Sequence, residues 1–246
     1  PADWDRLAGG NLFVCHAFLD ALHDTGCASQ RTGWLPQFAL LKRGHRLCGA
    51  FPLYLKSHSY GEYVFDWAWA NAYHRAGIDY YPKLVSAVPF TPVTGPRLLA
   101  PDAADRAALI DATLKLARDA RVSSLHCLFP TAAQADEMVA KGLLRRTGVQ
   151  FHWEGAYESF DAFLAAMSHD KRKKIRQERR KVSEAGIRFE HLRGTDIGER
   201  DWDFFYRCYV GTYRRHRSTP YLTRDFFTEI GRRLSDKVLL IVARRG

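Results

Sequence analysis

The segment Lys56–Leu99 reads KSHSYGEYVFDWAWANAYHRAGIDYYPKLVSAVPFTPVTGPRLL and is the least ordinary part of the chain. Aromatic residues alternate with other types between Glu62 and Ala70, which is typical of a strand with two unlike faces. Prolines exclude a long helix over its second half. Nine aromatic residues lie within the segment: Tyr60, Tyr63, Phe65, Trp67, Trp69, Tyr73, Tyr80, Tyr81 and Phe90.

Ionisable residues recur between these rings. They are Glu62, Asp66, His74, Arg75, Asp79, Lys83 and Arg97. A concave wall of aromatic rings with a few polar groups is the usual lining of a ligand pocket, and each ring removes a large apolar area from water when it is buried. The segment therefore favours a pocket. The alternative is a long irregular segment that its own rings hold against a sheet.

Most common catalytic motifs are absent from the sequence: it has no G-x-S-x-G, no Walker loop, no G-x-G-x-x-G and no H-E-x-x-H. His58, Glu62 and Asp66 have the i, i+4 spacing of a metal-binding helix face. Gly61 and the alternation argue against a helix there, so we expect no metal. We expect instead a pocket whose catalytic base is Asp66, Glu62 or His74. The residues expected to bind substrate are Tyr60, Tyr63, Trp67, Trp69, Tyr80, Tyr81, Lys83 and Arg97.

The composition is that of a globular protein. The chain has 246 residues, of which 46% are hydrophobic and 26% charged, which suits one large domain or two ordinary ones. The longest apolar run, Val238–Ala243, is too short to cross a bilayer. Five scattered cysteines without a C-x-x-C pair indicate reduced thiols, and hence a cytoplasmic protein.

Positive charge is concentrated in the second part of the chain. The net charge is +10, with +3 in residues 1–150 and +7 in residues 151–246, which favours an anionic partner. The run Ser168–Lys181 contains eight Lys or Arg residues. On a helix, Arg172, Arg176 and Arg179 share one face, so this face could contact phosphates or tRNA. The alternative is a solvated surface helix. No helix-turn-helix or zinc spacing accompanies it, so we expect no DNA binding.

The periodicity predicts an α/β protein. Helices are expected over residues 11–25, 102–120, 131–141, 159–167, 168–185, 199–217 and 223–234, and strands over 34–42, 46–56, 123–129, 143–153, 187–192 and 237–244. The pattern restarts near Gly155, and the strand over 143–153 could belong to both halves. The run Val238–Val242 is expected to be covered on both faces. We also expect that strand to have an unpaired edge, because its return strand would follow Gly246 in a longer chain.

Several motifs together resemble a bacterial family. They are NLFVCHAFLDAL at Asn11–Leu22, PLYLKSHSYGEYVFDWAWA at Pro52–Ala70, YYPKL at Tyr80–Leu84, PFTPVTGPR at Pro89–Arg97 and KRKKIRQERRKV at Lys171–Val182. With them the whole chain resembles the FemAB-like proteins of the GNAT superfamily, which are associated with peptidoglycan biosynthesis or recognition.

The resemblance implies tandem GNAT-like domains with mixed, partly parallel sheets. The first would occupy residues 1–150 and the second, incomplete, residues 151–246. It also implies transfer of an acyl or aminoacyl group to an amine, for example of a cell-wall peptide precursor. The donor would be acyl-CoA or aminoacyl-tRNA, and the Q/R-x-x-G-x-G/A loop of acetyl-CoA-using members is missing. A non-catalytic module that binds cell-wall peptide is the alternative function.

Overall fold

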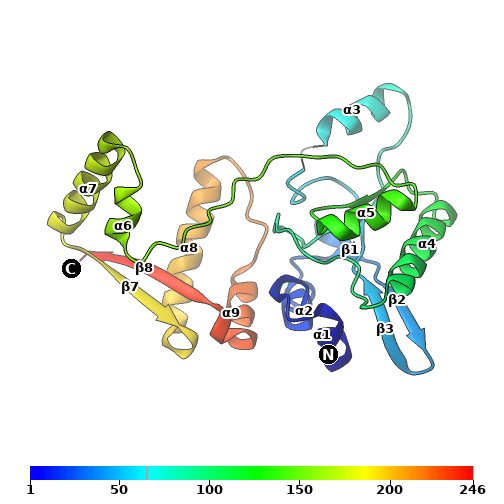
Figure 1. Cartoon of the computed structure of the whole chain (residues 1–246), viewed down its shortest axis with the longest axis horizontal. Helices are drawn as coiled ribbons and strands as arrows, with labels where there is room; N and C mark the ends of the chain where they lie inside the picture. Colours follow the sequence, from blue (N-terminus) through cyan, green and yellow to red (C-terminus); the bar gives the residue numbers. More distant parts are fainter. Residues whose placement is uncertain (65, 246) are drawn as a thin grey trace. The chain divides into compact units, whose positions relative to one another are not determined.

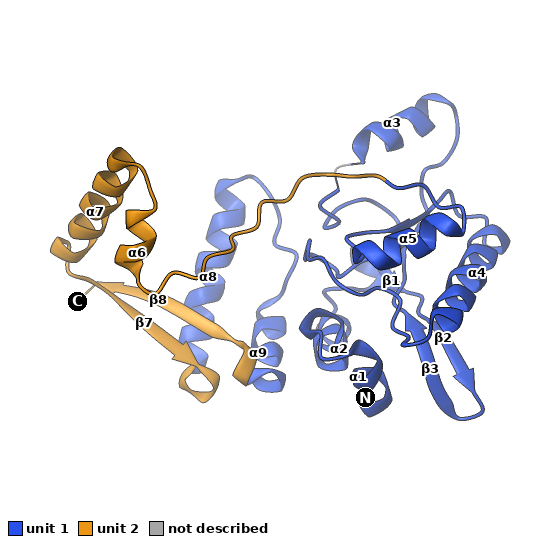
Figure 2. Ribbon diagram, in the orientation of Figure 1, with its two compact units in different colours: residues 1–145, 198–235 blue, residues 146–197, 236–246 orange. Residues whose placement is uncertain are grey.

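The computed structural model describes residues 1–64 and 66–245, so Phe65 and Gly246 lie outside the described residues (Figure 1). The chain forms two compact units (Figure 2). The first consists of Pro1–Arg145 and Gly198–Ser235, and the second of Arg146–Ile197 and Asp236–Gly246. The first unit therefore combines two segments that are far apart in the sequence.

A four-stranded mixed sheet with the order β1-β4-β5-β6 forms the centre of the first unit. It contains β1 (Trp34–Pro36), β4 (Tyr54–Lys56), β5 (Lys83–Ser86) and β6 (Leu125–Cys127). The pairs β1–β4 and β4–β5 are antiparallel, whereas β5–β6 is parallel. A parallel pair needs a crossover connection, and α4 (Ala103–Asp119) lies in it. The predicted α/β class with a partly parallel sheet is confirmed.

A separate hairpin is formed by β2 (Ala39–Arg43) and β3 (Arg46–Phe51). Gly44 has a φ of 59° in its turn, a conformation that favours glycine. The predicted hairpin is confirmed, but its strands are shorter than the expected runs 34–42 and 46–56. Pro36 ends β1 and Pro52 lies between β3 and β4, because proline cannot donate to a central ladder.

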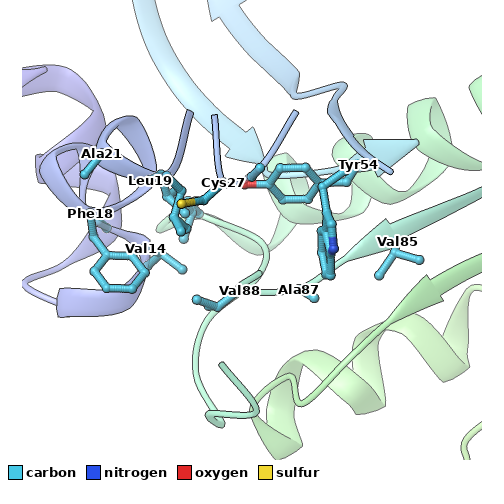
Figure 3. Packing of buried hydrophobic residues seen from close by; sticks show 14 of the residues in the cluster. Val14, Phe18, Leu19, Ala21, Cys27, Tyr54, Val85, Ala87 and Val88 are labelled. Carbon is cyan, nitrogen blue, oxygen red and sulfur yellow. The ribbon is translucent and has the colours of Figure 1, made fainter. Parts of the chain in front are cut away.

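Helices from both ends of the chain pack into the core of the first unit. They are α1 (Ala2–Ala8), α2 (His16–Asp24) and α9 (Arg224–Arg233), whereas α8 (Glu199–Arg215) packs against α9, with Phe205 edge to face on Phe227. Figure 3 shows Phe18 and Leu19 of α2 together with Tyr54 of β4 and Val88 beyond β5. The ring of Phe18 meets that of Phe226 of α9 edge to face, with 5.9 Å between centroids. The expected helix 11–25 begins as a 3₁₀ turn, Leu12–Val14, which Asn11 caps.

The segment after Asp66 differs from the prediction. Trp67–Arg75 forms helix α3, so the strand predicted from the alternation is wrong over residues 67–70. The alanines that separate the aromatic residues are strong helix formers, which favours the helix. Trp67 and Trp69 are exposed on it. Phe65, which belonged to the same predicted strand, lies outside the described residues.

The next predicted helices are confirmed by α4 and by α5 (Ala132–Ala140), whose cap Thr131 accepts a hydrogen bond from the Gln134 amide. The strand predicted over 143–153 is wrong, because this part of the chain forms no regular element. Leu144 and Phe151 are 94% and 98% exposed, so no neighbouring strand or core covers them. Apolar alternation alone cannot form a strand without a partner.

The second unit contains α6 (Phe160–Ala165), α7 (His169–Glu184), β7 (Ile187–Arg193) and β8 (Leu239–Arg245). The two strands form an antiparallel pair, and in the described part of the chain they have no third strand, as the predicted unpaired edge requires. Leu240 and Val242 are buried, whereas Leu239 and Ile241 are exposed. The prediction that β8 is covered on both faces is therefore wrong, since its side chains alternate between a packed and an open face.

Candidate functional site

Two lysines lie opposite each other at one end of the two inner strands of the central sheet. Lys56 ends β4, Lys83 begins β5, and the two are register partners. Both are completely buried. Like charges directly opposite on neighbouring strands destabilise a sheet, and burial raises the cost. Negative groups must therefore lie close to them.

Glu62 and Asp66 supply these negative groups. The Lys83 ammonium donates hydrogen bonds to Glu62 Oε2 at 2.9 Å, to Asp66 Oδ2, and to the Ser59 hydroxyl at 2.9 Å. The Tyr80 hydroxyl donates to the same Asp66 oxygen at 2.6 Å. Both carboxylates are at most 2% exposed. We call Lys56, Ser59, Glu62, Asp66, Tyr80 and Lys83 the buried charge cluster.

Lys56 is the less satisfied lysine of the cluster. Its ammonium donates to the Tyr60 carbonyl at 3.4 Å and lies 3.7 Å from the ring centroid of Trp34. A cation over the face of a tryptophan is attracted to the ring, but the ring replaces only part of the lost hydration. Burial, together with the charge of Lys83, lowers the pKa of Lys56 to about 7 despite the nearby acids.

The pKa values of the two carboxyl groups are shifted in opposite directions. Burial raises the pKa of Glu62 above its usual value, although Lys83 and Lys56 act against it. Burial acts in the same direction on Asp66, but the hydrogen bonds from Lys83, Tyr80 and Ser59 outweigh it and hold its pKa at about 2. A general base works best when its pKa lies near the working pH. Of the two predicted carboxylate bases, Glu62 is thus the better suited.

One oxygen of each carboxylate is buried without a hydrogen-bond partner among the described residues. These atoms are Glu62 Oε1 and Asp66 Oδ1. Buried carboxylate oxygens are costly unless a donor meets them. The cluster therefore has unused capacity to accept a proton or a hydrogen bond.

A pocket of about 240 Å³ adjoins the cluster. It is lined by Ala70, His74, Ile78, Asp79, Tyr80 and Tyr81. Tyr80 belongs to both sites, because its hydroxyl donates to Asp66, and the hydroxyl of Tyr81 contacts Ser59 of the cluster at 2.8 Å. His74 is exposed on α3 and lies in the pocket lining, without a described contact to the acids. The sequence-predicted residues thus divide between the pocket and the cluster.

The remaining predicted aromatic residues lie on the surface. Tyr60 and Trp67 meet edge to face at 5.1 Å, and both are at least 40% exposed. Trp69 is also exposed. Tyr63 has a φ of 59° and contacts the ring of Tyr221. None of these four side chains has a described hydrogen bond to the cluster acids.

Arg97 does not join this site. It is 1% exposed, and its guanidinium donates to the carbonyls of Val93, Pro96 and Leu128. Arg97 therefore links the loop between β5 and α4 to the residue that follows β6. It lines neither the pocket nor the cluster. Burial lowers its pKa.

The three predicted phosphate-binding arginines lie on α7 in the second unit. Arg176 lies 3.7 Å from Asp161, and the Arg179 guanidinium lies 4.2 Å from the ring centroid of Phe160. Arg172 is half-buried. The helix is otherwise solvent-exposed along most of its basic residues.

Lys56 and Ser59 were not predicted as site residues. The only signal for Lys56 is its place directly after the apolar run Phe51–Leu55, which is expected to form a strand that ends at Lys56. Ser59 has no signal in the sequence. Within residues 1–64 and 66–245, no group of three or more His, Cys, Asp or Glu side chains could hold a metal ion. No helix in that part is both long enough and apolar enough to span a bilayer.

The fold and the site define an α/β protein with a buried acid–lysine cluster beside a small aromatic pocket. All of the chain, residues 1–246, matches the family model FemAB-like, which is described as peptidoglycan biosynthesis/recognition. The chain belongs to the FemAB-like family, and membership implies a role in that process. No curated protein matches the chain.

Proposed function

We propose that the protein transfers an acyl or aminoacyl group to an amine of a cell-wall peptide precursor. The observation that carries this proposal is Glu62, a buried carboxyl of raised proton affinity whose second oxygen has no described partner. Amine attack on an ester or thioester forms a C–N bond, releases the alcohol or thiol, and requires that the amine lose a proton.

The acceptor binds in the pocket beside Tyr80 and Tyr81. The hydrogen-bonded chain from Tyr80 through Asp66 and Lys83 to Glu62 joins the pocket wall to the base. The proton passes along this chain, so that Asp66 is again ionised at the end of the transfer and Glu62 holds the proton. His74 lies in the pocket lining and orients the acceptor. Holding amine and donor in attack geometry supplies a large part of the rate.

The donor is aminoacyl-tRNA or acyl-CoA. The exposed arginines of α7 favour a donor rich in phosphate, since several guanidiniums on one helix face can meet successive phosphates. The proposal includes the tandem GNAT-like arrangement with a division near residue 150, and a cytoplasmic location where such donors occur. The compact units cross that division, because residues 198–235 pack with the first part of the chain.

The test is product formation. Purified protein is incubated with charged tRNA or acyl-CoA and a precursor peptide, and the peptide mass is measured. Transfer at a rate that falls at least about 100-fold in Glu62→Gln supports the proposal. Binding of the peptide without any product, from every donor, supports the non-catalytic binding module instead.

A further inference from the structure

Residues near the end of the chain contact the backbone that carries Glu62. Tyr213 of α8 and Tyr221, between α8 and α9, belong to the first compact unit together with residues 58–64. The hydroxyls of Tyr63 and Tyr213 lie next to each other. The rings of Tyr63 and Tyr221 meet edge to face at 6.3 Å. The segment with the acids is therefore contacted by residues from the second sequence segment of the first unit.

Tyr221 makes two further contacts, to Phe90 and to the backbone of Gly61, the residue before Glu62. Its ring stacks on Phe90, with centroids 5.1 Å apart and an interplanar angle of 15°. Its hydroxyl lies beside the backbone of Gly61. Tyr221 thus contacts both neighbours of Glu62 in the chain, Gly61 and Tyr63.

The backbone at these two neighbours is unusual. Gly61 has a φ of 79°, and a Cβ there would lie 2.5 Å from the Phe90 ring. Tyr63 has a φ of 59°, a left-handed conformation that is unfavourable for a non-glycine residue. Such conformations persist only when surrounding contacts determine them. The contacts available are those of Phe90, Tyr213 and Tyr221.

We propose that Tyr221 is a positioning residue, which fixes the backbone on both sides of Glu62 and so directs the carboxylate toward Lys83. Tyr213 assists through its hydroxyl, which lies next to that of Tyr63. The catalytic use of Glu62 rests on the proposed function, whereas the positioning of its backbone does not. The C-terminal helices α8 and α9 thereby become part of the site, although Glu62 lies more than a hundred residues earlier in the chain.

The Phe90 amide reports on this arrangement. It donates to the Gly61 carbonyl at 3.2 Å, so its hydrogen exchange measures how often the Gly61 backbone opens. In Tyr221→Ala we expect this exchange to rise about tenfold or more, and the pKa of Glu62 to fall toward its ordinary value as water reaches the carboxylate. Tyr221→Phe keeps the ring and should recover most of the protection.

The matched control is Tyr206→Ala. Tyr206 packs on Tyr209 and Phe227 within the same pair of helices, without a described contact to Gly61 or Tyr63. We expect its Phe90 exchange to stay within about twofold of wild type. Equal effects of the two alanine variants would overturn the proposal, because they would indicate general packing. Unchanged exchange in Tyr221→Ala would overturn it as well.

If Tyr221→Ala does not fold, Tyr213→Phe takes its place. This variant removes only one hydroxyl, and we expect Phe90 exchange to rise about threefold; no rise would contradict the proposal. Where transfer is measurable, Tyr221→Ala should lower kcat and leave the KM for the acceptor within about twofold. If the wild-type protein shows no transfer but the variants show the predicted exchange pattern, the proposed function is refuted and the positioning role of Tyr221 is not.

Discussion

Replacement of Lys56 by methionine should stabilise the protein most strongly below neutral pH. Lys56 is completely buried, with one carbonyl and the Trp34 ring as its partners. Its pKa is about 7, against 10.5 for an ordinary lysine. The unfolded chain therefore binds a proton between these two pH values that the folded chain does not bind.

The sign and size of this stability change follow from the linkage between proton binding and folding. A depressed lysine pKa lowers stability fully below pH 7, and the penalty disappears as pH rises toward 10.5. At 1.36 kcal/mol per pH unit, the gap corresponds to about 5 kcal/mol. Removing Lys56 also removes its attraction to Glu62, which offsets part of the gain. We expect Lys56→Met to gain about 2–5 kcal/mol at pH 6 relative to its effect at pH 10.

The assay is urea unfolding of both proteins at pH 6, 7.5, 9 and 10. Lys115→Met is the control, since Lys115 is exposed and pairs with the exposed Asp119 across one helical turn. Its effect should stay within about 0.5 kcal/mol of zero and show little pH dependence. A pH-independent effect of Lys56→Met, or a gain that grows toward high pH, would refute the account of a buried, weakly protonated lysine.

Three further outcomes are expected. Gly61→Ala should cost about 1–3 kcal/mol more than Gly77→Ala, because both have positive φ but only Gly61 faces the Phe90 ring; urea midpoints measure this, and equal losses would show that the ring yields. Thr131→Ala should lower the stability by about 1 kcal/mol by removing the cap of α5, and a change below 0.3 kcal/mol, as an order of magnitude, would show that water replaces the cap. If α7 binds tRNA, neutralising Arg172, Arg176 and Arg179 together should reduce the slope of log affinity against log salt by about 2, whereas Arg118→Gln on α4 should leave it unchanged; an unchanged slope in the triple variant would place the tRNA elsewhere.

The sequence predicted the local elements better than their pairing. Helices with a clear cap, such as Thr131 before α5 and Ser159 before α6, begin at the predicted place. The alternation over residues 67–70 misled, because alanines between aromatic residues satisfy a strand pattern and a helix propensity equally. The strand predicted over 143–153 is wrong because strand formation depends on a partner strand, which the local sequence does not reveal.

The candidate site was predicted in part for the same reason. Glu62, Asp66, Tyr80 and Lys83 were expected as site residues from their clustering in one segment, but not as one ionic cluster. Their contact depends on the register between β4 and β5, which also brings Lys56 opposite Lys83. The contact of Tyr221 with this segment could not be predicted, because no local sequence pattern relates Tyr221 to Gly61.

The central claim is that Glu62 receives the proton of the acceptor amine, and single-turnover transfer with Glu62→Gln tests it most directly. Gln keeps the shape of the side chain and its contact to Lys83 but cannot take up a proton. With charged tRNA or acyl-CoA and a precursor peptide, Glu62→Gln should be at least about 100-fold slower than wild type, while the exposed Glu158→Gln stays within about twofold. Transfer by Glu62→Gln at the wild-type rate would contradict the account.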